Sequence, residues 1–365
     1  MGNNLFITVN NKRFHYIWLR DNCLCSECRH STSFQKTYDY TKKPSPPEPL
    51  SVIEQDGELK IIWHEKPEHE SIFPIDWLLG YAYDPQPKTL EEADIILWNK
   101  SSLDANPPQK YDIHSCAEST WLNQLFMQGF TMLQKVSVEE IEPFLRSIGP
   151  ILETEYGKTN ELKPTANAKD LGFALQGPAL SPHTDHSYKL IKNLGECLYC
   201  VENNATGGES VIIDGFFLAQ EFRQHYPDYF QILTQTPVLF NHFDPEYGYF
   251  FSQKTPIIEL DEQGQISRLC FAHKNCARNI PFDQTELFYE AYSAFLSYLK
   301  NPDYQYRFRL EAGDCLIFWN SRILHGRTAY DASAGNRHLR LFLMDWDYFV
   351  ARRNFDRVKH LYLRE

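Results

Sequence analysis

Two sets of residues in this chain have the side chains and the spacing of metal sites. In SPHTDHSYKL, His183 and Asp185 stand one residue apart and His186 follows directly. Side chains alternate between the faces of a β-strand, so His183 and Asp185 would point the same way and could bind one ion together. Far along the chain, His325 in RILHGR would complete a set of two histidines and one carboxylate. Such a set leaves three positions open on Fe(II) and is typical of non-heme oxygenases.

An arginine further along the chain supports this interpretation. Arg337 in NRHLRLFL lies in a predicted strand after His325. The planar guanidinium binds a carboxylate through two hydrogen bonds, so Arg337 is a candidate anchor for the far carboxylate of 2-oxoglutarate. An HTD triplet alone often forms a surface pair by chance. The distal His325 and Arg337 are what favour an oxygenase site.

The second set is a cluster of thiols in RDNCLCSECRH: Cys23, Cys25 and Cys28. Closed zinc sites take four ligands, commonly cysteine and histidine, so one more ligand is needed. Three nearby histidines are candidates, and the spacing does not choose among them: His30, His64 and His69. An iron–sulfur cluster would need a fourth cysteine, and Cys116 lies far off. The cluster therefore predicts a structural metal that stabilises a small domain.

Composition limits the possible partners and the compartment. The 365 residues carry a formal charge of −12, so phosphate backbones repel the chain and nucleic acid is not an expected partner. No run of about 18 apolar residues occurs, which argues against a membrane span. Nine cysteines, an odd number, occur without a visible secretion signal. This pattern predicts a reducing, cytoplasmic location.

Apolar patterning divides the chain into a first domain (1–95), a linker (96–112, rich in proline and polar residues) and a second domain (113–365). Apolar runs predict strands within 4–10, 58–64, 209–216, 255–260, 314–320 and 337–348. Helical spacing predicts helices after Pro74 and within 119–130, 137–149, 283–302 and 351–365. Ser137 with Glu140, and Asp283 with Glu286, have the spacing of capping residues. Short strands with few helices favour a β-sandwich or jelly roll.

Taken together, these motifs resemble the γ-butyrobetaine and trimethyllysine dioxygenase family of Fe(II)/2-oxoglutarate oxygenases. The resemblance extends through nearly the whole chain and rests on WLRDNCLCSEC, EHESIFPIDWL, HTD, TGGESVIIDGF, LHGR and RHL. It implies a mainly β protein with flanking helices. It also implies a double-stranded β-helix (jelly-roll) core, a small N-terminal zinc-binding domain and a homodimer.

The resemblance also implies roles for single residues. Iron would be bound by His183, Asp185 and His325. Zinc would be bound by Cys23, Cys25, Cys28 and His69. 2-Oxoglutarate would be held by Arg337 with help from Ser210. The implied reaction consumes O2, converts 2-oxoglutarate to succinate and hydroxylates an unactivated C–H bond of a small molecule. Because Asp185 is present, halogenation is disfavoured.

The substrate pocket departs from the family pattern. Family members hold a trimethylammonium group in an aromatic cage by cation–π attraction. Tyr156 matches one cage tyrosine, whereas other positions differ: Asn160, Asp170, Phe173, His186 and Leu343. We therefore expect a substrate other than γ-butyrobetaine or trimethyllysine. The alternatives are a cage rebuilt from other aromatic residues such as Tyr188 or Tyr247, a non-catalytic scaffold with a relic pocket, and a zinc hydrolase.

Overall fold

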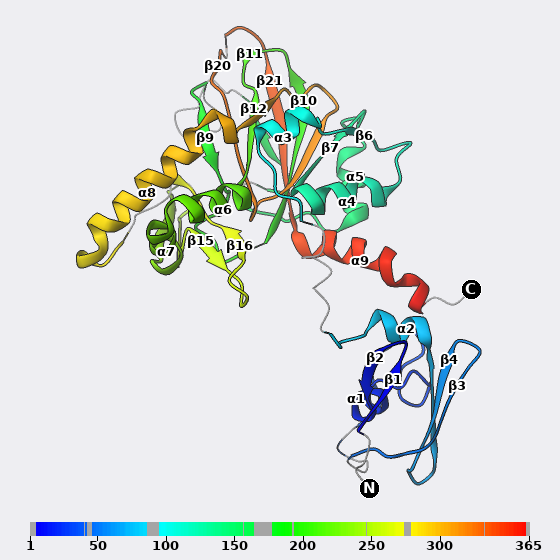
Figure 1. The fold of residues 1–365 in the computed structure, drawn as a ribbon. Helices are drawn as coiled ribbons and strands as arrows, with labels where there is room; N and C mark the ends of the chain where they lie inside the picture. Colours follow the sequence, from blue (N-terminus) through cyan, green and yellow to red (C-terminus); the bar gives the residue numbers. More distant parts are fainter. Residues whose placement is uncertain are drawn as a thin grey trace. The chain divides into compact units, whose positions relative to one another are not determined.

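The computed structural model of the chain describes residues 5–39, 41, 46–85, 95–155, 157–163, 177–191, 193–245, 247–273, 279–331 and 333–362. The chain forms two compact units (Figure 1). One comprises Met1–Ala93 together with Phe355–Glu365, and the other comprises Asp94–Asn354. The C-terminal tail thus groups with the first unit, although the sequence assigned it to the second domain. No helix among these residues is long and apolar enough to cross a membrane.

The first unit consists of short strands and helices. In chain order these are β1 (Phe6–Val9), β2 (Lys12–His15), α1 (Tyr16–Asp21), β3 (Pro49–Gln55), β4 (Glu58–Trp63), β5 (His69–Pro74) and α2 (Ile75–Gly80). β1 and β2 form a hairpin, and β3, β4 and β5 form an antiparallel sheet. Alternate residues of β4, Leu59, Ile61 and Trp63, are fully buried, as strand alternation requires. The strands predicted at 4–10 and 58–64 and the helix after Pro74 are confirmed.

Two sheets form the centre of the second unit. The larger has the order β6-β7-β18-β10-β21-β8 and the smaller β17-β12-β19-β9. Neighbouring strands are antiparallel except for β6 and β7. Their bounds are β6 (Lys110–Asp112), β7 (Phe130–Gln134), β8 (Asn160–Leu162), β9 (Leu180–His183), β10 (Leu194–Asn203), β12 (Ser210–Asp214), β17 (Tyr306–Phe308), β18 (Cys315–Trp319), β19 (Ile323–Arg327) and β21 (Arg337–Asp345). Side chains of both sheets meet in one buried cluster, which includes Ile212, Leu316, Phe318 and Leu339.

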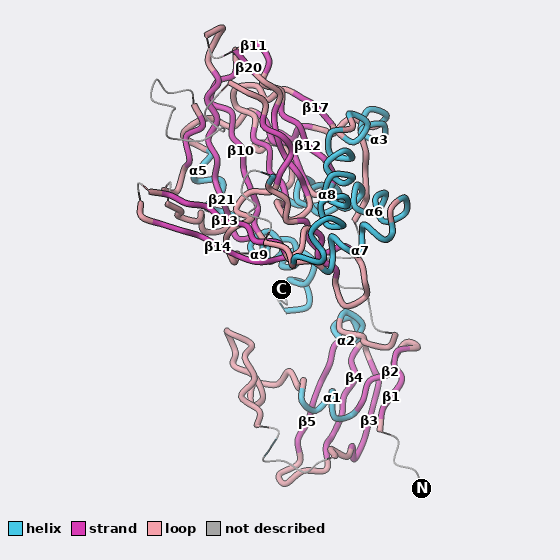
Figure 2. Tube along the Cα trace, turned by 90° about the vertical axis from the view of Figure 1, so that its left-hand side faces the viewer, coloured by secondary structure: helices cyan, strands magenta, loops and turns pink. Residues whose placement is uncertain are grey.

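Helices cover the outer faces of both sheets. α4 (Glu118–Gln128), α5 (Ile141–Ile148) and the start of α9 (Trp346–Tyr362) pack on the larger sheet. α6 (Gly215–His225), α7 (Pro227–Gln235) and α8 (Thr285–Lys300) pack together in a cluster that reaches Ile213 and Leu324 of the smaller sheet. Figure 2 shows α6 and α8 on the side of β12, away from β10 and β21. Three two-stranded sheets complete the described part of the unit: β11 (Thr206–Gly207) with β20 (Tyr330–Asp331), β13 (Val238–Asp244) with β14 (Tyr249–Thr255), and β15 (Ile258–Leu260) with β16 (Ile266–Leu269). The second and third are hairpins, whereas β11 and β20 come from distant parts of the chain.

The sequence predicted a linker at residues 96–112, and this segment forms regular elements in the structure. It contains a helix, α3 (Lys100–Ala105), and β6, which pairs with β7 in the larger sheet. Trp98 is 2% exposed and packs in the core between the sheets. Pro107 and Pro108 therefore mark a short connection between α3 and β6.

Helix starts were predicted less well than helix positions. Glu140 accepts a hydrogen bond from the Ser137 N–H (2.9 Å), which is one half of the predicted capping box, but α5 begins only at Ile141. A 3-10 turn (Phe282–Gln284) precedes α8, and the N-cap of that helix makes no side-chain hydrogen bond, so the predicted Asp283 cap is wrong. The predicted strand 337–348 ends at Asp345 because α9 begins there.

A buried ion pair joins the start of the second unit to its sheets. The Arg322 and Asp214 side chains are both fully buried, and Arg322 Nη2 donates to Asp214 Oδ2 at 2.7 Å. Arg322 also donates to the carbonyls of Ile96 (2.7 Å) and Met127 (3.0 Å). Arg322 is the residue immediately before β19. Its guanidinium thus links Ile96, α4 and β12 to the start of that strand.

We expect Arg322→Ala to lower the free energy of unfolding by about 3–5 kcal/mol, because it leaves the Asp214 carboxylate buried without its cation. Chemical denaturation of the full chain measures this loss. Lys100→Ala is the control, since it removes an exposed pair with Asp104 and should change stability by about 0.5 kcal/mol or less. Equal stability of the two variants would contradict the role given to Arg322.

Candidate functional site

Two paired strands and a turn bring together the three residues of the predicted iron site. His183, the last residue of β9, pairs directly with His325 of β19. His183 Nε2 lies 3.1 Å from Asp185 Oδ1, and His325 Nε2 lies 4.0 Å from Asp185 Oδ2. One donor atom from each of the three lies within 4.8 Å of the other two. Two imidazole nitrogens and a carboxylate so placed fit one divalent transition-metal ion.

Asp185 does not reach this position by strand alternation, as the sequence suggested. β9 ends at His183, and Asp185 lies in the turn that follows. Asn320 fixes that turn through two bonds to the backbone of Asp185. The Asp185 N–H donates to Asn320 Oδ1 (2.9 Å), and Asn320 Nδ2 donates to the Asp185 carbonyl (3.0 Å).

The protonation states of the three residues suit metal binding. His183 Nδ1 lies 2.9 Å from the Ser181 carbonyl, which can only accept, so Nδ1 carries the hydrogen and Nε2 offers its lone pair. Burial, aided by His183, lowers the pKa of His325 to about 3, so its imidazole is neutral. Burial acts to raise the pKa of Asp185, but the two adjacent imidazoles, first His183 and then His325, hold that pKa below its ordinary value.

Two glycines permit close approaches at this site. A Cβ on Gly326, between His325 and Arg327, would collide with the Leu180 carbonyl of β9, so glycine allows β9 and β19 to pair here. Gly208 has a φ of +71°, which favours glycine, and a Cβ there would lie 3.1 Å from Nε of Arg337.

A cavity of about 440 Å³ adjoins the three residues and contains the predicted 2-oxoglutarate anchors. Arg337 and Ser210 are each 6% exposed and both line it. Burial, then the neighbouring Arg327, lowers the pKa of Arg337 to about 10. Its Nε has no hydrogen-bond partner among the residues that the structure describes. A buried cation at the wall of a cavity suits a carboxylate ligand.

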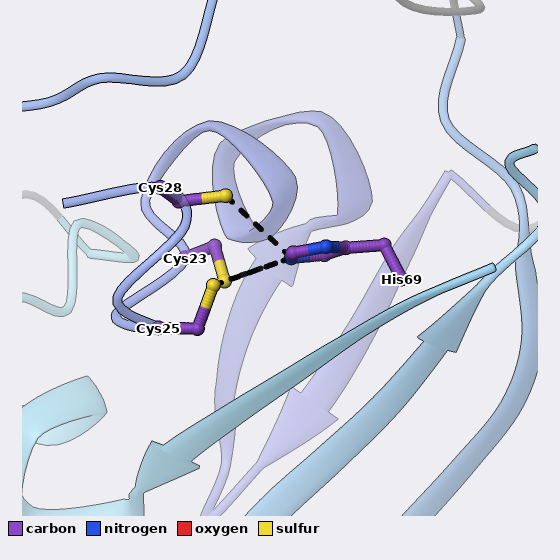
Figure 3. Close-up of side chains that lie close together, drawn as sticks. All are labelled: Cys23, Cys25, Cys28 and His69. Carbon is purple, nitrogen blue, oxygen red and sulfur yellow. Dashed lines mark hydrogen bonds between the residues drawn. The ribbon is translucent and has the colours of Figure 1, made fainter. Parts of the chain in front are cut away.

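The first unit brings Cys23, Cys25, Cys28 and His69 together (Figure 3). Their sulfur atoms lie 3.3, 3.7 and 3.5 Å from Nε2 of His69, in chain order. Tetrahedral zinc with ordinary bond lengths would separate sulfur and nitrogen ligands by about 3.6 Å. His30 and His64 are exposed and outside this cluster, so the geometry selects His69 from the three candidate histidines.

Charged groups surround the thiol cluster. Arg20 is 1% exposed, forms an ion pair with buried Glu65 and donates from Nη1 to Cys28 Sγ at 3.4 Å. A hydrogen bond from Cys23, opposed by burial and aided by Arg20, lowers the pKa of Cys28 to about 5. Glu27 Oε2 lies 3.6 Å from Nδ1 of His69, where a carboxylate orients a metal-binding imidazole.

Comparison with known proteins agrees with this geometry. Residues 92–342 match the sequence profile of the family described as "Taurine catabolism dioxygenase TauD, TfdA family". The chain belongs to the TauD/TfdA family. It is thus a member of the Fe(II)/2-oxoglutarate-dependent dioxygenases, as the resemblance implied. Residues 5–79 match a second profile, the N-terminal domain of γ-butyrobetaine hydroxylase-like proteins.

Relatives extend over nearly the whole chain. γ-Butyrobetaine dioxygenase of Homo sapiens is 29% identical over 351 residues, which cover 92% of this chain and 89% of that protein. Trimethyllysine dioxygenase of Meyerozyma guilliermondii is 25% identical, and the match covers 94% of this chain and 90% of that protein. A putative α-ketoglutarate-dependent taurine dioxygenase structure from Burkholderia xenovorans superposes with a TM-score of 0.51 at 13% identity, over 69% of this chain and 91% of that one. This superposition supports a TauD-like fold, mainly strands with helices.

Three of the six predicted substrate residues line the cavity. They are Asn160 at the start of β8, His186 in the turn after Asp185, and Leu343 of β21. His186 has a φ of +53°, and its buried Nδ1 has no partner in the described part of the chain. The other three, Tyr156, Asp170 and Phe173, lie outside the described residues.

Two further cavity residues, Arg327 and His242, were not predicted from the sequence. Arg327 lines the cavity beside Arg337 and donates to the Pro178 carbonyl (2.8 Å); its place within LHGR was a signal that could have identified it. His242 of β13 stacks on Tyr188, with ring centroids 4.6 Å apart, and both line the cavity. Nothing in the sequence indicated that the β13–β14 hairpin would reach this site.

Proposed function

We propose that this protein is a hydroxylase that uses Fe(II), 2-oxoglutarate and O2 to oxidise an unactivated C–H bond of a small molecule. The observation that carries the proposal is the convergence of His183, Asp185 and His325 beside a cavity that contains Arg337. We further infer that the two central sheets are the double-stranded β-helix of this enzyme class. Their antiparallel order and the buried cluster between them support that inference.

Each residue has a stated part in the proposed site. His183 and His325 bind iron through Nε2 and Asp185 through its carboxylate, while Asn320 holds the turn that carries Asp185. Arg337, with Ser210, holds the far carboxylate of 2-oxoglutarate. Bound iron supplies O2 activation coupled to decarboxylation of the keto acid to succinate, and the protein positions the target C–H bond.

Two alternative functions, a non-catalytic scaffold and a zinc hydrolase, explain fewer of the residues at this site. A non-catalytic scaffold has no need of a complete donor set with neutral imidazoles. A zinc hydrolase uses a general base near the metal and gives Arg337 no role. Asp185 also disfavours halogenation, which needs an open position in place of the carboxylate.

We expect His183→Ala and Asp185→Ala to abolish O2-dependent succinate formation while leaving far-ultraviolet circular dichroism unchanged. Each substitution removes one of the three donors that the described residues bring together at this site. Succinate is measured after incubation with Fe(II), 2-oxoglutarate and candidate substrates. Undiminished succinate in either variant would falsify the iron-site assignment.

Arg337→Met is the control that separates the keto acid from the metal. It leaves the metal donors intact but removes the carboxylate anchor, so the 2-oxoglutarate requirement should rise roughly ten- to a hundredfold. An unchanged requirement would move the anchor to another arginine, with Arg327 and Arg340 as the candidates.

We also propose that the Cys23, Cys25, Cys28 and His69 cluster binds a structural zinc ion. The sulfur–nitrogen distances near 3.6 Å support it, as does Arg20, whose cation offsets the negative charge of three thiolates around a divalent ion. A unit of this size has a small core and gains stability from a bound metal.

Metal analysis should find about one tightly held zinc per chain, and Cys25→Ser should lose it and lower the melting temperature of the first unit's transition. Cys116→Ser is the matched control, because Cys116 lies outside the cluster and should keep the zinc. Full zinc content in the Cys25→Ser protein would show that these thiols are not the site.

For the substrate, we propose a small molecule other than γ-butyrobetaine or trimethyllysine, with a polar or hydrogen-bonding group where the family places its methyl groups. Tyr188 is the one Phe, Tyr or Trp among the described residues that line the cavity. Burial lowers the pKa of His186, which favours a neutral imidazole that can hydrogen-bond an amine or hydroxyl. Lys158 also lines the cavity, and its charge repels a quaternary ammonium.

Turnover of γ-butyrobetaine and trimethyllysine should be poor beside a panel of primary amines, amino acids and uncharged alcohols. Three missing aromatic contacts of about 0.5–2 kcal/mol each would weaken binding of a trimethylammonium group roughly ten- to ten-thousandfold. Rapid, saturable hydroxylation of γ-butyrobetaine at micromolar concentration would instead indicate a cage rebuilt around Tyr188. Tyr247 is a weaker candidate, since it is 51% exposed and does not line the cavity.

A homodimer and a cytoplasmic location remain predictions from the sequence. Sedimentation of the full chain would test the first, and microscopy of the tagged protein in its native cell would test the second.

A further inference from the structure

A buried carboxyl group near the proposed iron site has no role in the function described so far. Glu196, on the central strand β10, is 0% exposed. Neither of its carboxyl oxygens has a hydrogen-bond partner within the part of the chain that the structure describes. An unpartnered polar group costs a folded protein stability, so such a group is expected to meet a partner when the site is loaded.

Glu196 faces the space between the two sheets. Residues directly opposite each other in antiparallel strands point to the same face. Glu196 is opposite Phe318 of β18 and Leu343 of β21. Phe318 belongs to the cluster between the sheets, and Leu343 lines the cavity. Both neighbours are apolar and leave the carboxyl without a polar contact.

Glu196 lies close to the nitrogen of His325 that is proposed to bind iron. Glu196 Oε2 lies 3.9 Å from His325 Nε2. Since Nε2 is the atom that points at the proposed metal, the carboxyl lies on the metal side of this imidazole.

Glu196 does not belong to the donor cluster itself. The group whose donor atoms all lie within 4.8 Å of one another contains His183, Asp185 and His325 but not Glu196. A fourth ligand on the same ion would meet that limit. The carboxyl is therefore placed to contact what the metal carries and not the metal.

We propose that Glu196 is a positioning residue that hydrogen-bonds an oxygen atom held at an open position of the metal, supplied by water or by 2-oxoglutarate. This inference rests on the proposed iron site. It requires no movement of the backbone, because Glu196 is already beside His325. It also gives the one carboxyl buried between Phe318 and Leu343 a partner.

The test uses the full chain, stripped of iron, with Mn(II) as the probe. Mn(II) prefers oxygen and nitrogen donors and does not compete for the thiol cluster. Free Mn(II) is followed by electron paramagnetic resonance, and 2-oxoglutarate binding at saturating Mn(II) by calorimetry. Glu196→Leu should weaken one of these affinities about five- to tenfold. If only the affinity for Mn(II) is weaker, the partner of Glu196 is a metal-bound water. If only the affinity for 2-oxoglutarate is weaker, the partner is an oxygen of the keto acid.

Two further variants separate this role from a structural one. Glu196→Gln keeps a hydrogen-bonding group and should stay within about threefold of the wild type. Thr131→Val is the matched control. Thr131 of β7 is also buried, and its hydroxyl has no partner among the described residues, but it is opposite Ile317, which faces the helices. Thr131→Val should leave both affinities unchanged. Metal-free Glu196→Leu should melt at least about 2 °C higher than the wild type, since it loses a buried unpartnered group.

Unchanged affinities in Glu196→Leu would overturn the proposal. Equal losses in Glu196→Gln and Glu196→Leu would also overturn it, since they would show that charge and not a hydrogen bond is at work. Failure of the wild-type protein to bind Mn(II) at the histidines would instead contradict the proposed function itself.

Discussion

The pairing of β9 with β19 places His183 opposite His325, and the rest of the candidate site is arranged around that pair. The two strands can approach only because Gly326 has no side chain to meet the Leu180 carbonyl. The turn after β9 then brings Asp185 back toward both imidazoles, and Asn320 holds its backbone from the connection between β18 and β19. The geometry of three metal donors therefore depends on one strand pair and one asparagine.

The same connection ties the site to the core. Asn320 bonds Asp185, and Arg322, two residues later, forms the buried ion pair with Asp214. Arg322 also binds the carbonyls of Ile96 and Met127. Arg322 thus holds the segment around Ile96, where the chain enters the second unit, at the start of β19. Rigid support of this kind keeps metal donors in place before the metal arrives.

Residue types with narrow chemical uses made much of the site predictable. The thiol cluster indicated metal binding because few other roles need three thiols at that spacing. The HTD triplet indicated it only together with the distal His325 and Arg337. The strands β12, β18 and β21 were found from their apolar runs. β10, the longest strand of the larger sheet, was missed: both of its faces are buried, so it shows no alternation, and it carries Glu196 and two cysteines. The contacts of Asp185 with Asn320 and of Tyr188 with His242 join distant segments, so only the tertiary structure reveals them.

Two of the candidate substrate residues lie on a different sheet from the two histidines of the proposed iron site. His183 and His325 belong to the smaller sheet, whereas Asn160 and Leu343 belong to β8 and β21, which pair at the edge of the larger one. A substitution of Asn160 or Leu343 can therefore reshape this side of the cavity without moving the strand pair that holds the imidazoles. Such a separation lets descendants of one ancestor exchange substrates by single mutations while they keep the same oxidising centre. Selection can act on substrate choice and on the reaction almost independently in a protein built this way.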